Sequence, residues 1–212
     1  MYIRDEQETS KDLRTDDSSV QDTKLFPAHW VTEAESSAAA GNYKGATAAN
    51  FYTAFGTSAD ENGYVMDAKS LKKVIADGKT EGSTDAAVAG KYAVMNTFFV
   101  GSKGANLENL KVEGCSIKDT EGAGAEFDNA LRVLVTCGDN WVLCGPTGVL
   151  ASSDGNSVLA PTVSATESEI KMFVFYDGDD AKIYTNNLEA LKTASKRINV
   201  VFTATSTQTD KK

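Results

Sequence analysis

Apolar residues recur at every second position in several short segments of the second half of the chain. Between Tyr92 and Val100, both sets of alternating positions are largely apolar, which predicts a central strand covered on both faces. In residues 109–117, Leu110 and Val112 alternate with charged side chains, so this segment is predicted to be the partner strand.

A hairpin is predicted next, because apolar runs lie on both sides of Gly138-Asp139-Asn140, which suits a three-residue turn. Such a turn would place Cys137 opposite Trp141 and Cys144 opposite Leu134. The two cysteines would then face opposite sides of the sheet, and a disulfide bond between them would require the backbone to move.

Three later segments are also predicted to be strands. Residues 158–165 follow a turn at residues 152–157, and residues 171–176 have the composition of a buried strand. The last strand has one apolar face, formed by Ile198, Val200, Phe202 and Ala204.

Two segments have helical spacing instead. Asp67 can cap a helix that ends near Gly78. Its apolar face is formed by positions i, i+3 and i+4: Leu71, Val74 and Ile75. Asn186 or Asn187 can cap a shorter helix carrying Leu188, Leu191 and Ala194.

Strands outnumber helices, and no repeat or proline-rich linker divides the chain. We therefore predict a mainly β protein, an antiparallel β-sandwich with two or three short helices inserted. Residues 1–24 are predicted to be a polar N-terminal segment, for which mobility is one interpretation. Residues 25–206 are predicted to form a single domain, and residues 207–212 a polar tail.

Composition narrows the classes of function. The 212 residues include 21 basic and 30 acidic side chains, and the formal charge of −9 argues against nucleic acid or an anionic membrane as the main partner. The sequence contains no apolar run of membrane-spanning length and no signal peptide. A cytosolic protein and a secreted protein supplied without its leader both fit these observations.

The cysteines and the single histidine are candidate metal ligands. Cys115, Cys137 and Cys144 with His29 could supply a tetrahedral set, but the cysteine spacing lacks the close pair of typical zinc sites. Buried, reduced cysteines and a structural histidine are the favoured interpretation. If any disulfide forms, the predicted hairpin leaves only Cys115 as a partner for another cysteine.

An acidic loop is the candidate metal site. Asp177, Asp179 and Asp180 provide three carboxylates around a glycine, and oxygen-rich loops of this kind can bind calcium. The alternative is a solvated turn. No other cofactor is predicted.

Motifs for catalysis and phosphate binding are absent from the sequence. Gly101-Ser102-Lys103-Gly104 lacks the spacing of a phosphate-binding loop, and no nucleophile elbow or zinc-protease motif occurs. The protein is therefore predicted not to be an enzyme. A secreted hydrolase would need a cleft with two facing carboxylates.

The segment of residues 92–117, YAVMNTFFVGSKGANLENLKVEGCSI, resembles the central strand pair of secreted surface proteins of Gram-positive, gut-type Clostridia. Four later segments keep the order found in that group: Ala130–Val133, Met172–Asp180, Asn186–Leu188 and Ile198–Thr205. The group is similar to the TasA/camelysin-like matrix proteins, which have a jelly-roll β-sandwich and are exported. The leader and first aromatic strand of that group are not in this chain, and camelysin's metalloprotease activity has no zinc motif here to support it.

The resemblance implies a jelly-roll-like fold and a secreted or cell-surface location. We expect a structural or adhesive protein of a bacterial surface or extracellular matrix, which associates with itself or with cell-surface components. The missing first strand would leave a groove or an open sheet edge, and a strand from a neighbouring subunit could fill that edge. The alternative is a carbohydrate- or calcium-binding module, which would expose Tyr176 or Trp141 beside a concave acidic site.

Overall fold

The fold is seen in a computed structural model. It describes residues 1–4, 28–30, 51–53, 59–60, 63–64, 73–74, 94–121, 125–177, 180 and 195–206. Within these residues the protein is mainly β, and every strand pairing is antiparallel.

The larger of the two main sheets has six strands. In spatial order they are β1 (Tyr2–Arg4), β7 (Val94–Gly101), β13 (Ser168–Tyr176), β9 (Leu131–Cys137), β10 (Asn140–Gly145) and β11 (Gly148–Ser152). Residues 2–4, which the sequence places in a polar N-terminal segment, therefore form an edge strand of this sheet. Because Tyr2 pairs with Gly101, β1 covers only the last residues of β7.

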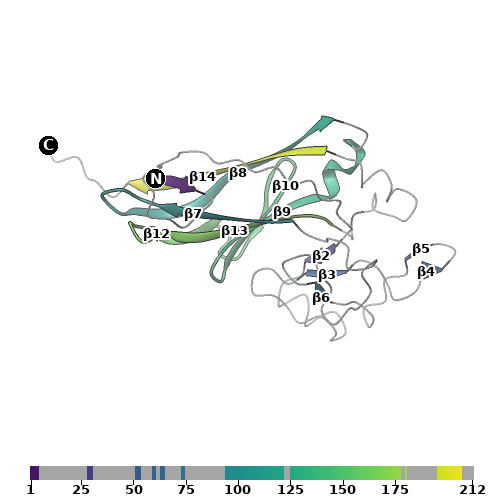
Figure 1. The fold of residues 1–212 in the computed structure, drawn as a ribbon, viewed down its shortest axis with the longest axis horizontal. Coiled ribbons are helices and arrows are strands. Elements are labelled where there is room, and N and C mark those ends of the chain that lie inside the picture. The colour runs from purple at the N-terminus through teal and green to yellow at the C-terminus, as the bar shows by residue number, and fades with distance from the viewer. Residues whose placement is uncertain are drawn as a thin grey trace.

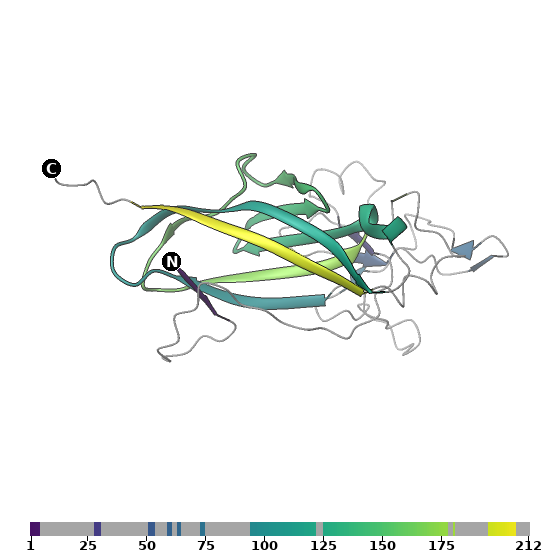
Figure 2. The ribbon, with the colours of Figure 1, turned by 90° about the horizontal axis from the view of Figure 1, so that it is seen from above.

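The second main sheet has three strands, in the order β12 (Val158–Val163), β8 (Leu107–Glu121) and β14 (Ser195–Ser206). Its longest ladder, β8 with β14, shifts register at three points: Ser195/Lys196, Val201/Phe202 and Thr203/Thr205. A six-residue 3-10 helix, η1 (Ala125–Ala130), lies between β8 and β9. Figures 1 and 2 show β8 and β14 side by side over the six-stranded sheet.

Two small sheets lie in the first half of the chain. One contains β2 (Ala28–Trp30), β3 (Phe51–Thr53) and β6 (Lys73–Val74), and the other contains β4 (Ala59–Asp60) and β5 (Gly63–Tyr64).

The two main sheets share one hydrophobic core. The three-stranded sheet contributes apolar side chains from β8 and β12, among them Leu110, Val112 and Leu159. The six-stranded sheet contributes Val133 of β9 and Val174 of β13, together with other residues at every second position of these strands. Burial of this apolar surface stabilises the contact between the layers. The predicted apolar face of the last strand is confirmed for Ile198, Val200 and Phe202, which pack against the core.

The six-stranded sheet also carries buried side chains on its other face. Leu134, Phe173 and Phe175 alternate with the core-facing residues of β9 and β13, and each is almost completely buried. Phe173 lies directly opposite Leu134 in the ladder. The prediction of a buried strand at residues 171–176 is therefore confirmed, with both faces of β13 buried near its end.

The predicted pairing of the two strands in residues 92–117 is wrong. Residues 94–101 form β7 in the six-stranded sheet, whereas β8 lies in the opposite sheet, between β12 and β14. The connection after Gly101 crosses from one layer to the other, and it is held where the Ser102 amide donates to the Ser164 carbonyl oxygen at 2.8 Å. Inside the turn, Ser102 Oγ donates to the Ala105 carbonyl oxygen at 2.7 Å.

The predicted hairpin exists, but its register is wrong by one residue. Cys137 pairs with Asn140 across a two-residue turn, and Gly138 has a φ of 56°, in the left-handed region that glycine tolerates. Asn140 therefore begins β10, and its Nδ2 donates to the Leu159 carbonyl oxygen of the opposite sheet at 3.0 Å. Cys144 pairs with Val133, so Cys137 and Cys144 lie on the same face of the sheet.

The helix predicted between Asp67 and Gly78 is contradicted at Lys73–Val74, which form β6 and pair with Phe51 and Tyr52 of β3. The helix was predicted from only three apolar residues, and strand pairing can override so short a pattern. Val74 is also β-branched, and β-branched residues favour strands. The remainder of that segment and the helix predicted after Asn186 lie outside the described residues. Within the described part of the chain, η1 is the only helix.

Candidate functional site

An apolar groove lies on the side of the molecule where the edges of the two main sheets approach each other. Its volume is about 310 Å³. One wall comes from β1, β7 and β13, and the other wall comes from β14. The apolar lining includes Tyr2, Phe98, Val100, Met172, Val200 and Phe202.

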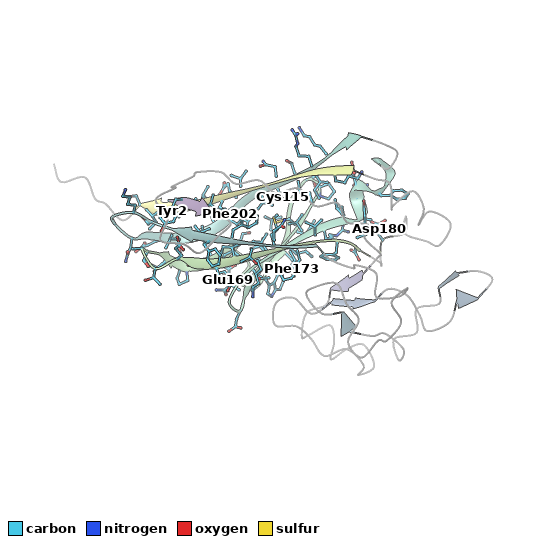
Figure 3. All side chains as sticks on the ribbon, in the orientation of Figure 1. Tyr2, Cys115, Glu169, Phe173, Asp180 and Phe202 are labelled. Carbon is cyan, nitrogen blue, oxygen red and sulfur yellow. The ribbon has the colours of Figure 1, made fainter. Side chains whose placement is uncertain are left out.

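The groove is open to solvent at its rim. Val201 and Met1 both line it, and each has an exposed fraction of 44%. Figure 3 shows Phe202 of β14 beside Tyr2 of β1. Exposed large apolar side chains at a sheet edge are typical of interaction surfaces.

The strand that forms the outer wall is a terminal strand of its sheet. β14 has 12 residues and pairs with β8 on one side. Its charged side chains are Lys196 and Arg197, and it contains no carboxylate. A long edge strand with a positive end therefore borders the groove in a protein of net charge −9.

One end of β14 is tied to η1 by an ion pair. Lys196 Nζ lies 2.5 Å from Asp128 Oδ1, and the Lys196 side chain is almost completely buried. The pair fixes the start of β14 against the connection between β8 and β9.

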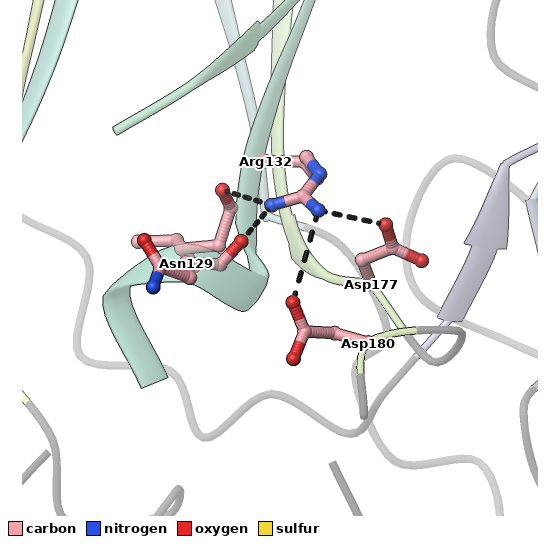
Figure 4. Close-up of polar contacts among 5 residues, drawn as sticks. Asn129, Arg132, Asp177 and Asp180 are labelled. Carbon is pink, nitrogen blue, oxygen red and sulfur yellow. Dashed lines mark hydrogen bonds and ion pairs between the residues drawn. The ribbon is translucent and has the colours of Figure 1, made fainter. Parts of the chain in front are cut away.

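Arg132 organises the acidic loop that was predicted as a calcium site. Arg132 Nη2 lies 3.1 Å from Asp177 Oδ2 and 4.0 Å from Asp180 Oδ2. Arg132 Nη1 donates to the carbonyl oxygens of Asn129 and Leu131 (Figure 4). The guanidinium thus joins the end of β13 to the end of η1.

The loop that was predicted to bind calcium is therefore already paired with a cationic side chain, the Arg132 guanidinium. A calcium ion would have to compete with the guanidinium for Asp177 and Asp180. Asp179 lies outside the described residues. Within the described part of the chain, no three His, Cys, Asp or Glu side chains are placed to hold a metal ion together.

Of the two aromatic residues proposed for carbohydrate binding, Tyr176 and Trp141, one is buried in the core. Tyr176 has an exposed fraction of 3% and belongs to the core, so it does not present a ring to a sugar. Trp141 is half-buried on the opposite face of the sheet.

The three cysteines are free and occupy different environments. Cys115 of β8 and Cys144 of β10 are buried in the shared core, and their thiols are hydrogen-bonded to each other. Cys137 is half-buried near the hairpin turn. Burial, followed by the negative charge of Glu169, raises the pKa of Cys137. The side chain of His29 lies outside the described residues.

No protein-family model and no curated protein matches this chain. No helix in the described part of the chain is long and apolar enough to cross a membrane.

Sequence reasoning predicted a groove or an open sheet edge from the missing first strand, but it did not find the residues that line the groove. Its inner wall includes Met1, Tyr2 and Ile3, which the sequence groups with a polar segment, although Tyr2-Ile3 is an apolar pair at the start of that segment. The apolar face of β14 was found from its alternation. That alternation does not reveal that β14 is an edge strand, because edge position depends on how the sheets are assembled.

Proposed function

We propose that this protein is an exported structural or adhesive protein of a bacterial surface or extracellular matrix, built as a jelly-roll-like β-sandwich. A strand of a second copy adds to the outer edge of β14 and covers the groove. The observation that carries the proposal is the groove between β14 and β1, with an edge strand of 12 residues along it.

The strand order supports the jelly-roll part of the proposal. In an eight-stranded jelly roll, the second, seventh, fourth and fifth strands form one sheet, and the first, eighth, third and sixth form the other. The order β7-β13-β9-β10 matches the first sheet, and β14-β8-β12 matches three strands of the second. In this scheme β11 and β1 are additions.

The comparison also indicates where a further strand belongs. The first strand of a jelly roll pairs with the last, and in this chain that place is the outer edge of β14. The described residues contain no strand there. An added strand would pair with the backbone of β14 and place alternate side chains into the apolar groove, as in other cases of strand addition.

Charge supports a second copy of this chain as the occupant. Lys196 is buried against Asp128, so Arg197 is the exposed charged side chain of β14, and β14 has no acidic residue. The whole chain, in contrast, has nine more acidic than basic residues. Attraction between this edge and the acidic remainder of another copy would bring the copies together. A cell-surface component with an exposed, acidic strand is the other occupant that the test distinguishes.

Sedimentation over a wide range of protein concentration tests self-association. We expect wild-type protein to associate and Val201→Lys to remain monomeric, because a lysine on an edge strand disfavours strand addition. Val149→Lys is the matched control. Val149 is also an exposed valine on an edge strand, β11, with an exposed fraction of 37%, and its substitution should leave association unchanged.

Hydrogen exchange locates the contact. Amides of β14 should become protected as concentration rises, and those of β11 should not. Wild-type protein could instead stay monomeric at every concentration and bind acidic extracts of the cell surface. That result would show that the occupant is a cell-surface component and not a second copy. Association that is lost in Val149→Lys and kept in Val201→Lys would contradict the role of β14. Antibody labelling of intact, unpermeabilised cells tests the exported location.

A further inference from the structure

Cys115 and Cys144 meet across the core. Cys115 lies on β8 of the three-stranded sheet, and Cys144 lies on β10 of the six-stranded sheet, so the pair connects the two layers. Cα atoms of β8 and β10 approach within 8 Å of each other. The two side chains are 8% and 0% exposed, and the thiols are hydrogen-bonded to each other.

Cys137 does not share this arrangement. It lies on the same face of the sheet as Cys144, but at the opposite end of the β9–β10 hairpin, where it pairs with Asn140. Cys144 pairs with Val133, four residues from Cys137, which corresponds to about 13 Å along an extended strand. That separation is well beyond the reach of a disulfide bond.

We propose that Cys115 and Cys144 form a disulfide bond that joins the two sheets. The hydrogen bond between the thiols places the two sulfur atoms side by side, and a bond requires them to close to about 2.05 Å. Immunoglobulin domains contain an inter-sheet bond of this kind between two packed β-sheets, which shows that the spacing of two such layers allows it. The inference goes beyond the proposed function and does not depend on assembly.

The reaction is a thiol–disulfide exchange with a small-molecule or protein disulfide as the oxidant. The Cys115 thiolate attacks one sulfur of the incoming disulfide, and the other sulfur leaves as a thiolate. Cys144 then attacks the mixed disulfide, which forms the Cys115–Cys144 bond and releases the second half of the oxidant. In total, two protein thiols are oxidised, one disulfide is reduced to two thiols, and the two protons pass to the products.

In the slow reaction of the folded protein, the electrostatics of the pair favour Cys115 as the first nucleophile. The hydrogen bond from the Cys144 thiol stabilises a thiolate on Cys115 and lowers the pKa of Cys115, although burial acts in the opposite direction. The same hydrogen bond, together with burial, raises the pKa of Cys144. Cys144 therefore keeps its proton until the second step.

Burial also determines when the bond forms. Both sulfurs are closed off from solvent, so a disulfide reagent reaches them in the unfolded or partly folded chain and reacts slowly with the folded protein. Refolding with a mixture of oxidised and reduced glutathione should give the bond within the folding reaction. Adding the same mixture to folded, reduced protein should give it far more slowly.

The test uses the wild-type chain, refolded with and without the glutathione mixture. Mass spectrometry under non-reducing conditions should give a mass about 2 Da below that of the reduced protein, with one free thiol and a linked peptide pair containing Cys115 and Cys144. Reduction should lower the Tm by about 5–10 °C, because the bond closes a long loop through β9 and β10. Three free thiols after oxidative refolding, or a linked peptide containing Cys137, would overturn the proposal.

Variants provide the matched controls. Cys137→Ala should keep both the linked peptide and the reductant-dependent change in Tm. Cys115→Ala and Cys144→Ala should each lose the dependence on reductant. A Tm that still falls on reduction in Cys144→Ala would overturn the proposal, and so would a Tm of Cys137→Ala that reduction leaves unchanged. The thiol count on wild-type protein decides the question even if a core variant fails to fold.

Discussion

The ring of Tyr2 lies against the backbone of Gly101, so closely that a Cβ atom at position 101 would come within 2.4 Å of Tyr2 Oη and 2.6 Å of Tyr2 Cζ. The two residues are also partners in the ladder between β1 and β7. Glycine at position 101 therefore leaves the space in which the Tyr2 ring packs against β7 and lines the groove.

Gly101→Ala should release β1. The added methyl group cannot coexist with the Tyr2 ring in its present position, so the ring must move and the ladder should open. We expect exchange at the Ile3 amide to become roughly tenfold faster and the stability to fall by about 1–3 kcal/mol. Gly114→Ala in β8 is the control, because a Cβ atom there meets nothing within 4 Å. Equal exchange at Ile3 in wild type and Gly101→Ala would contradict this account.

Arg132→Met should destabilise the protein by about 1–3 kcal/mol, because it leaves the partly buried carboxylates of Asp177 and Asp180 without the guanidinium. The cost can be measured by urea denaturation. Lys171→Met removes an exposed pair with Glu169 and should change stability by less than about 0.5 kcal/mol. Similar values for the two variants would show that Arg132 does not organise the acidic loop. Calcium should raise the Tm of Arg132→Met more than that of wild type, since the competing cation is gone.

Phe173→Ala should be among the most damaging substitutions, with a loss of about 3–5 kcal/mol. Phe173 is fully buried on the face of the six-stranded sheet that points away from the shared core. Leu150→Ala, at an exposed apolar side chain of β11, should cost less than about 0.5 kcal/mol. A cost below about 1 kcal/mol for Phe173→Ala would mean that this second face is not a buried layer.

Asp154 should make the stability depend on pH. Slight desolvation raises the pKa of Asp154, but hydrogen bonds to Oδ1 from the Asn156 and Val158 amides and the Ser152 hydroxyl lower it overall. A depressed pKa in the folded state stabilises the protein above the carboxyl's pKa in the unfolded chain. That stability is lost as the pH falls through the folded-state pKa.

Asp154→Ala should therefore be less stable than wild type near neutral pH, and the difference should shrink as the solution is acidified below about pH 4. Urea denaturation at several pH values gives the difference directly. Asp154→Asn keeps an oxygen acceptor without a titratable charge, so its own stability should lack this acid-dependent component. A constant difference between wild type and Asp154→Ala down to low pH would contradict the role of the carboxylate.

Acidification should promote association. The charge of −9 keeps copies apart near neutral pH, and protonation of carboxylates reduces the repulsion. Light scattering should rise as the pH falls from about 7 to about 5, and Val201→Lys should show a smaller rise than Val149→Lys. Unchanged scattering between the two pH values would count against assembly by this chain.

Local pattern was sufficient to find most strands of the second half of the chain. β14 follows from apolar alternation, because half-buried strands bury every second side chain. β7 and β13 follow from short runs that are apolar on both faces, which is typical of strands covered on both sides. The partner of each strand was harder to predict. β8 follows β7 in the chain, and consecutive strands usually pair, but here the connection crosses the core and β8 joins the other sheet.

The hairpin shows how a turn of one residue fewer changes a local prediction. Gly138-Asp139-Asn140 suits a three-residue turn, yet Asn140 pairs with Cys137 in β10, which leaves two residues for the turn. The side chain of Asn140 also bonds to the Leu159 carbonyl oxygen of the opposite sheet, a contact that the local sequence does not reveal. This one-residue shift places Cys144 on the core face, where it meets Cys115. Arg132 was missed in the acidic loop because it lies far from Asp177 in sequence and meets it only after β9 and β13 pair.

The three register shifts between β8 and β14 have a consequence for any filament that this protein forms. Bulges increase the right-handed twist of a ladder, so the outer edge of β14 is coiled along its length. Each copy added to that edge would be rotated relative to the one before it. A contact that repeats with a fixed rotation and does not close into a ring generates a helix. Filaments of this chain should therefore wind with a regular pitch, and the pitch should change if one of the extra residues that β8 carries at these shifts is removed.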